Sequence, residues 1–234
     1  MQHKFTPQTR MSHLIDEDAT LLSTISRFGI SFGFGDKTII EACKANKIDT
    51  GTFLSVVNFI TEGNIETVET VNNISIETVI NYLKSGHSYF LAYKLPSIRQ
   101  KLLEAVDSSD QSISYKQVFV RFFDEYVDEV RKHMEYEDRT VFPYVMQLLE
   151  GKKSTKYRIS VFEEHHTDVD SKLAELKNIL IKYYPSKGNN YLLNEVLFDL
   201  YACEKDLATH NRIEDCFFVP VIEAIEQKLI DSYE

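Results

Sequence analysis

One pattern of four residues occurs twice in this chain. In each copy a histidine is followed four residues later by a glutamate and an aspartate, and ten residues later by a proline. The copies consist of His133, Glu137, Asp138 and Pro143, and of His210, Glu214, Asp215 and Pro220. On an α-helix, residues i and i+4 lie one above the other on the same face, so each copy directs an imidazole and a carboxylate toward one point. Two such helices supply a good part of a dinuclear metal site.

Long amphipathic segments occupy most of the chain. With only 8 glycines and 5 prolines in 234 residues, turn signals are rare and the segments between them are long, which favours an all-α fold. Four segments repeat apolar residues at steps of three and four, and the first is expected to continue past Pro96 with a kink. They cover residues 76–106, 119–141, 159–180 and 193–224. Short polar connections between them predict an up-down four-helix bundle.

The N-terminal part has a different pattern. Residues 1–62 contain shorter helical stretches, at residues 21–28, 38–46 and 52–61, and predict a small helical domain. Residues 63–74 mix Glu, Gly, Asn, Thr and Val and are interpreted as a linker. We therefore expect the bundle to occupy residues 75–230, beginning at Ser75 as an N-cap.

Composition excludes several classes of function. The net charge of −10 argues against a nucleic-acid partner, which needs a basic face. No apolar run approaches the length that spans a bilayer, and residues 1–10 lack the apolar core of a signal peptide. The 3 cysteines are far apart and odd in number, which favours a reducing compartment over a disulfide scaffold. We expect a cytoplasmic protein with no membrane segment.

Six polar residues interrupt the apolar faces of the four long segments. They are His87, His133, Glu137, His166, His210 and Glu214. A buried carboxylate without compensation costs several kcal/mol, and a bound cation offers that compensation. Imidazole together with carboxylate suits iron, manganese or zinc better than calcium. A single histidine on an apolar face is more often an ordinary core residue, but four in-phase histidines on four helices favour a metal site.

Two adjacent histidines compete for the ligand position on the third segment. His166 is in phase with Phe162, Val169 and Leu173, which form the core-facing row. His165 lies on a flanking polar row. The helical period therefore favours His166 as the ligand and leaves His165 beside the site or on the surface.

These motifs resemble those of the hemerythrin-like (HHE cation-binding) proteins. The resemblance covers roughly residues 74–228 and rests on four motifs in order. They are His87 with Leu95-Pro96, His133/Glu137 with Phe142-Pro143, Glu164-His165-His166 with Val169-Asp170, and His210/Glu214 with Pro220. The two H-x-x-x-E pairs are similar to those of the RIC (repair of iron centres, ScdA-type) branch. Classical oxygen-carrying hemerythrins instead have H-x-x-x-H on the third helix.

The N-terminal residues resemble the small ScdA domain that precedes the bundle in RIC proteins. The similar stretch runs from Phe28 to Phe32 and continues to Cys43. That domain normally carries two adjacent cysteines followed by two glycines, whereas Gly33, Phe34, Gly35 and Asp36 stand here. The thiol chemistry of the family therefore does not carry over. RIC bundles also tend to have a further histidine on or after the first helix, and this chain has none between His87 and His133.

The resemblance implies a non-haem di-iron protein that repairs iron–sulfur clusters after nitrosative or oxidative stress. It implies two Fe ions, with Mn or Zn as alternatives, held by the four histidines as terminal ligands. Glu137 and Glu214 would bridge the ions together with an oxo or hydroxo group. O2 or NO is then the expected small ligand, with iron–sulfur proteins and a second copy of the chain as candidate partners. The alternatives are an O2- or NO-binding sensor module and a di-iron NO reductase or oxidase, so the sequence leaves open whether the protein is an enzyme.

Overall fold

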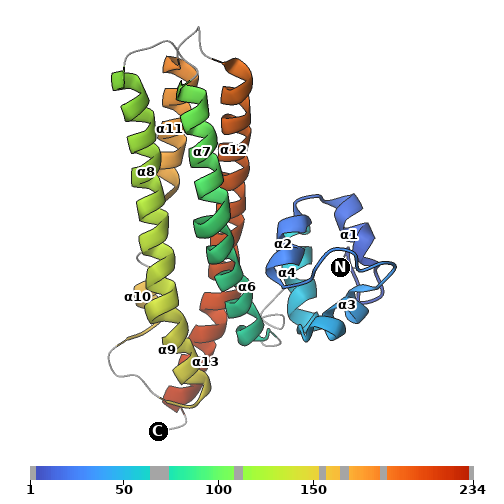
Figure 1. Cartoon of the computed structure of the whole chain (residues 1–234). Helices are drawn as coiled ribbons and strands as arrows, with labels where there is room; N and C mark the ends of the chain where they lie inside the picture. The colour runs from blue at the N-terminus through green and yellow to red at the C-terminus, as the bar shows by residue number, and fades with distance from the viewer. Residues whose placement is uncertain are drawn as a thin grey trace. The chain divides into compact units, whose positions relative to one another are not determined.

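The computed structural model describes residues 4–63, 74–107, 113–152, 157–163, 169–184 and 189–231. These residues form helices and connecting turns, and they include no strand. The only bridge in the described part of the chain pairs Arg10 with Thr38. The all-α prediction is therefore confirmed, and Figure 1 shows the helices in chain order.

Contacts divide the chain into two compact units. The first comprises residues 1–86, 148–153 and 212–234, and the second comprises residues 87–147 and 154–211. Two of the boundaries fall inside long helices, one beside His87 and one beside Arg212. The predicted domain limits at residues 62 and 75 stay a prediction, and most of the predicted linker lies outside the described residues.

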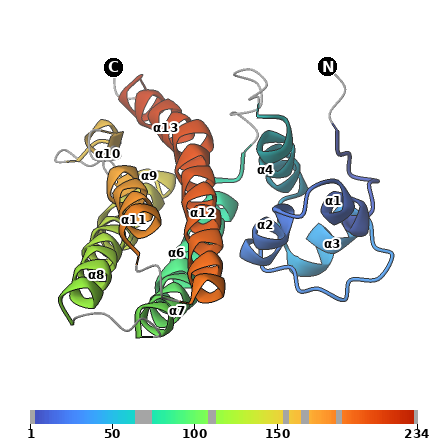
Figure 2. The same ribbon diagram turned by 90° about the horizontal axis from the view of Figure 1, so that it is seen from above.

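The second unit is the body of the helical bundle. Its long helices are α7 (Leu95–Asp107), α8 (Ile113–Tyr136), α11 (Val169–Tyr183) and α12 (Asn190–Ile213), which stand side by side around one core in Figure 2. Aromatic and aliphatic side chains from all four helices fill that core, including Leu102, Phe123, Leu176 and Leu200, each fully buried. This is the arrangement that the heptad-like apolar spacing predicts.

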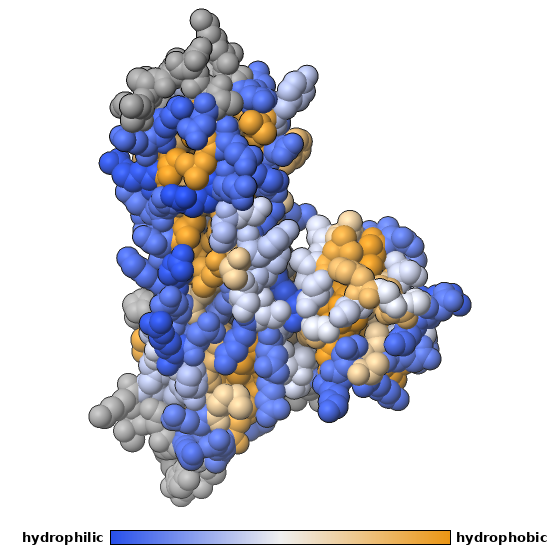
Figure 3. Space-filling model, in the orientation of Figure 1, coloured by the Kyte–Doolittle hydropathy of each residue, from blue (hydrophilic) through white to orange (hydrophobic). Residues whose placement is uncertain are grey.

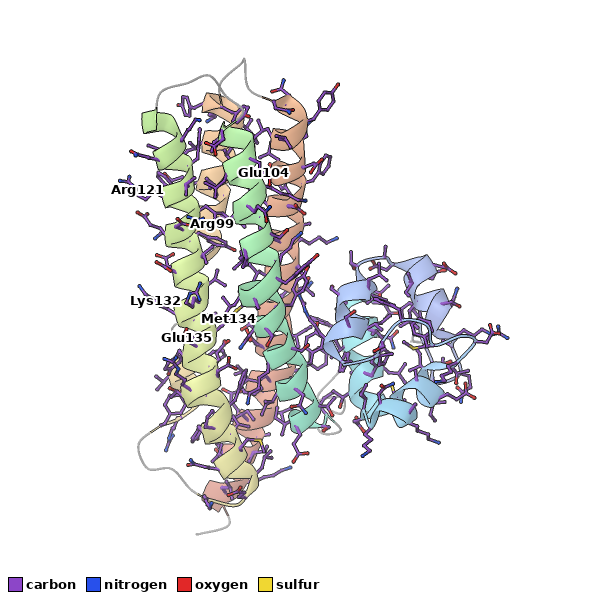
Figure 4. All side chains as sticks on the ribbon, in the orientation of Figure 1. Arg99, Glu104, Arg121, Lys132, Met134 and Glu135 are labelled. Carbon is purple, nitrogen blue, oxygen red and sulfur yellow. The ribbon has the colours of Figure 1, made fainter. Side chains whose placement is uncertain are left out.

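Ion pairs join neighbouring helices on the outside of this body. Arg99 on α7, labelled in Figure 4, donates from Nε to Asp124 Oδ1 on α8 at 2.7 Å. Lys94 and Lys101 both donate to Asp199 on α12, at 2.7 and 2.6 Å. Such pairs, being partly exposed, contribute on the order of 1 kcal/mol or less each and mainly fix which helix faces which.

In the part of the chain that the structure describes, three short π-helical segments interrupt the long helices. They are η1 (Phe90–Lys94), η2 (Glu137–Val141) and η3 (Glu214–Phe218). In each case the residue after the segment donates its backbone N–H to the carbonyl oxygen of the residue five positions earlier. The donors and acceptors are Leu95 and Phe90, Phe142 and Glu137, and Val219 and Glu214. Each donor residue precedes a proline, which lacks an N–H and cannot continue the usual ladder. The first long helix therefore passes Pro96, as predicted, by means of a π segment.

The first unit contains the N-terminal helices. They are α1 (Met11–Glu17), α2 (Leu21–Arg27), α3 (Ile39–Asn46) and α4 (Thr50–Glu62). Thr38 and Glu41 form a capping box before α3, and Asp49 caps α4 by accepting the Thr52 N–H. The predicted short helices are found, whereas α1 is an addition. Its N-cap residue Arg10 makes no side-chain capping bond, so the usual start signal is missing.

The same unit includes α6 (Ile76–Tyr89) up to Gly86, and α13 (Val219–Asp231). These are the first and the last of the helices that follow residue 74. Phe28 packs against Phe53 of α4 and Tyr82 of α6, with ring centroids 4.9 and 4.8 Å apart. Phe59 of α4 meets Phe217 of η3 edge to face at 5.1 Å. The N-terminal helices thus share an aromatic core with residues close in sequence to His87 and Glu214.

On the face shown in Figure 3, hydrophilic residues cover much of the long helices, with smaller apolar patches among them. Among the described residues, no helix is both long and apolar enough to cross a membrane.

Candidate metal centre

Polar side chains gather where the π segments begin. Glu137 is the first residue of η2 and Glu214 the first residue of η3, and each lies one helical turn after its histidine. His87 lies in the last turn of α6, immediately before η1. π segments inside α-helices are frequent at functional sites, because the extra residue changes the direction of nearby side chains.

Glu137 lies between histidines of two different helices. Its Oε2 is 3.0 Å from Nε2 of His87, and its Oε1 is 3.2 Å from Nε2 of His133. Glu137 is fully buried and His87 is 2% exposed, while His133 is 15% exposed. Both oxygens of a buried carboxylate therefore face imidazole nitrogens.

His210 brings the last long helix to the same place. Its ring centroid is 5.2 Å from that of His87 and 5.9 Å from that of Phe90. Glu214 follows one turn later and is fully buried. One ligand atom each from His87, Glu137, His210 and Glu214 lies within 4.8 Å of the other three.

The structure thus brings together four of the six residues that the sequence singles out, with His133 in contact through Glu137. His166 and His165 lie outside the described residues. The predicted ligand roles of all six remain predictions.

The donor set fits a divalent cation. The four clustered residues offer imidazole nitrogens and carboxylate oxygens, which suit iron, manganese or zinc. Both carboxylates are fully buried, where an ionised group is costly without a neutralising charge. A bound cation would supply that charge.

Comparison with known protein families agrees with this chemistry. The family model of the hemerythrin HHE cation-binding domain matches residues 78–222, which is more than half of the chain. The chain belongs to the hemerythrin HHE family. A search of curated proteins finds no match. Membership makes the protein a metal-binding helical bundle, and the finer RIC assignment remains a proposal.

One contact of this HHE site was not expected from the sequence. Nδ1 of His87 lies 3.1 Å from Oδ1 of Asp138, the residue after Glu137. The His87 ring also stacks on Phe142, with centroids 5.6 Å apart and an angle of 18° between the planes. The only sequence signal was the glutamate–aspartate pair, which occurs in both copies of the pattern.

The N-terminal helices of this HHE protein contain one cysteine, Cys43, and it is fully buried. Burial raises the pKa of its thiol to about 11, so at neutral pH the nucleophilic thiolate is scarce. Cys43 therefore does not replace the cysteine pair of the ScdA domain.

Proposed function

We propose that this chain binds two iron ions at the candidate metal centre. The observation that carries the proposal is the cluster of two buried carboxylates and two buried imidazoles within 4.8 Å. Glu137 and Glu214 enter from different helices and would bridge the two ions, while His87, His133, His166 and His210 would each supply a nitrogen. Carboxylate bridges of this kind occur in other di-iron four-helix bundles.

The residues around the centre have separate tasks in this proposal. Bound iron supplies a Lewis acid and a redox centre for O2 or NO. Phe90 packs edge to face with His210 and Phe142 stacks on His87, so both rings would help to exclude water from these imidazoles. His133 is the most exposed described member of the set, so we assign the approach of a small ligand to its side.

As the cellular role, we propose RIC-type support of iron–sulfur cluster repair under nitrosative or oxidative stress. The two H-x-x-x-E pairs and the ScdA-like N-terminal helices support it. Because Cys43 is buried and the cysteine pair is missing, the repair step would depend on the iron centre and not on N-terminal thiols.

A sensor is the second candidate, and a specific set of contacts favours it. Within the first unit, Phe59 of α4 packs on Phe217, and Arg212 lies over the Phe59 ring at 4.7 Å. Both partners flank Glu214 in sequence. A change at Glu214 on ligand binding would therefore reach α4 directly, as a sensor requires.

Metal analysis and an optical spectrum of protein purified with and without air test the di-iron proposal. About two irons per chain are expected, and one zinc with no iron would overturn it. Addition of iron-loaded protein to a nitrosylated iron–sulfur enzyme then distinguishes the roles. Recovery of enzyme activity supports repair, whereas ligand binding without recovery supports sensing. Catalytic consumption of NO or O2 would instead indicate a di-iron reductase or oxidase.

A further inference from the structure

His87 is held through both nitrogens of its ring by two consecutive residues of η2. Its Nε2 lies 3.0 Å from Glu137 Oε2, and its Nδ1 lies 3.1 Å from Asp138 Oδ1. Phe142 stacks on the same ring. All three neighbours come from one short segment, residues 137–142, whereas His87 comes from another helix.

The two carboxylates have different surroundings. Glu137 is fully buried in the cluster, while the Asp138 side chain is 38% exposed. Asp138 is absent from the group of clustered candidate ligands. It therefore lies on the outer side of His87, with the imidazole between it and the site.

Carboxylates face both ring nitrogens of His87, so a cation bound in the cluster decides the tautomer: Nε2 would then offer its lone pair to the cation, and Nδ1 would keep the proton. A carboxylate only accepts hydrogen bonds, so Asp138 would accept that proton from Nδ1. With the cation bound, the opposite tautomer would place a lone pair on Nδ1 against the Asp138 carboxylate, which is unfavourable.

We propose that Asp138 is a positioning residue that orients His87 for cation binding through Nε2. The proposal rests on the proposed cation site and adds to it the residue that stabilises this tautomer of one ligand and raises its basicity. Outer carboxylates that accept the second N–H of a ligating histidine typically contribute about 10- to 100-fold to metal affinity. Because Asp138 is partly exposed, its removal leaves no buried cavity.

The test compares two substitutions that each remove one negative charge from neighbouring turns. Asp138→Ala removes the partner of His87, whereas Glu135→Ala removes a carboxylate that pairs with Arg139 at 3.1 Å. Glu135 is labelled on α8 in Figure 4 and serves as the matched control for overall charge. Affinity for Zn(II) is measured in the full-length protein by competition with a chelator.

We expect Asp138→Ala to weaken zinc binding about 10- to 100-fold and Glu135→Ala to weaken it less than about 3-fold. Asp138→Asn keeps an acceptor oxygen without the charge, so it should recover part of the loss. Nitrogen-15 NMR of histidine-labelled, zinc-loaded protein adds a readout of the tautomer. The His87 Nδ1–H signal should persist in the wild type and in Glu135→Ala but exchange rapidly in Asp138→Ala.

If Asp138→Ala and Glu135→Ala lost the same amount of zinc affinity, the effect would come from net charge alone, and the proposal would be overturned. An unchanged His87 Nδ1–H signal in Asp138→Ala would overturn it as well. Failure of the wild type to bind any divalent cation is a different result, because it would refute the proposed metal function itself.

Discussion

The two copies of the histidine–glutamate–aspartate pattern share the spacing of these residues and a π segment but differ in their surroundings. In the first copy, His133 is 15% exposed and stacks on Phe162 with an angle of 12° between the planes. In the second copy, His210 is 1% exposed and lies against the rings of His87 and Phe90. One motif thus serves as the more open part of the site and the other as part of the core. Ligand spacing alone does not fix how much each residue contributes to stability.

The largest effect should come from the two glutamates, where the copies are expected to behave alike. Because each carboxylate is proposed to bridge two cations, Glu137→Gln or Glu214→Gln should lower metal affinity by more than about 100-fold. Metal-to-protein ratios after dialysis should fall from about two to one or less. Glu135→Gln is the control. A full loss in one variant and none in the other would break the equivalence of the copies.

The two histidines are expected to differ in how much they stabilise the metal-free protein. His210→Ala opens a cavity in the core and should lower the free energy of unfolding by about 2–3 kcal/mol. His133→Ala removes a partly exposed ring and should lower the free energy of unfolding by less than about 1 kcal/mol. Urea unfolding followed by circular dichroism measures both values. A larger cost for His133→Ala would contradict the assigned difference in burial.

Weakening the contact between α4 and residues near Glu214 should change the second copy of the pattern and leave the first unchanged. Phe59→Leu keeps an apolar side chain but loses the edge-to-face contact with Phe217 and the cation–π contact with Arg212. The free energy of unfolding should therefore fall by about 1 kcal/mol. Hydrogen exchange should then accelerate in residues 214–218 and stay unchanged in residues 137–141. Equal acceleration in both segments would show a general loss of stability and weaken the case for a sensor.

The smallest effect is expected from the prolines that follow the π segments. Pro143→Ala or Pro220→Ala restores an N–H donor and should raise the free energy of unfolding by about 1 kcal/mol or less. Metal affinity should change by less than a few-fold in both variants, because the packing of the residues after each π segment still holds Glu137 or Glu214 in its place. Thermal unfolding and chelator competition check these values. Destabilisation together with a loss of affinity greater than about 10-fold would show that the prolines themselves maintain the π segments.

The sequence predicted the helices well because their apolar period extends over many turns. It also placed His87, Glu137, His210 and Glu214 on core-facing positions, and the structure brings these residues together. The contact between His87 and Asp138 was not predictable in the same way. It joins residues 51 positions apart, and helical periodicity says nothing about which carboxylate meets which ring nitrogen.

The π segments were missed for a related reason. A search for a period of 3.6 residues assumes an uninterrupted α-helix, and one extra residue changes the phase only locally. The prolines at positions 96, 143 and 220 were the available signal, and they were interpreted as kinks or as family markers. The stacking of His133 on Phe162 likewise joins residues that are distant in sequence, so helical periodicity could not predict it.

The π segments also bear on which insertions and deletions the chain tolerates. Each π segment can be regarded as an α-helix with one inserted residue. The helical period of the residues after the segment is therefore offset from the helical period of the residues before it. Deleting one residue within 137–141 would remove this offset and rotate everything downstream by about 100° relative to the histidine. Phe142 would then leave the His87 ring and Val145 would leave the core. Among natural relatives, we therefore expect length changes to avoid these five-residue windows, even where the amino acids within them vary.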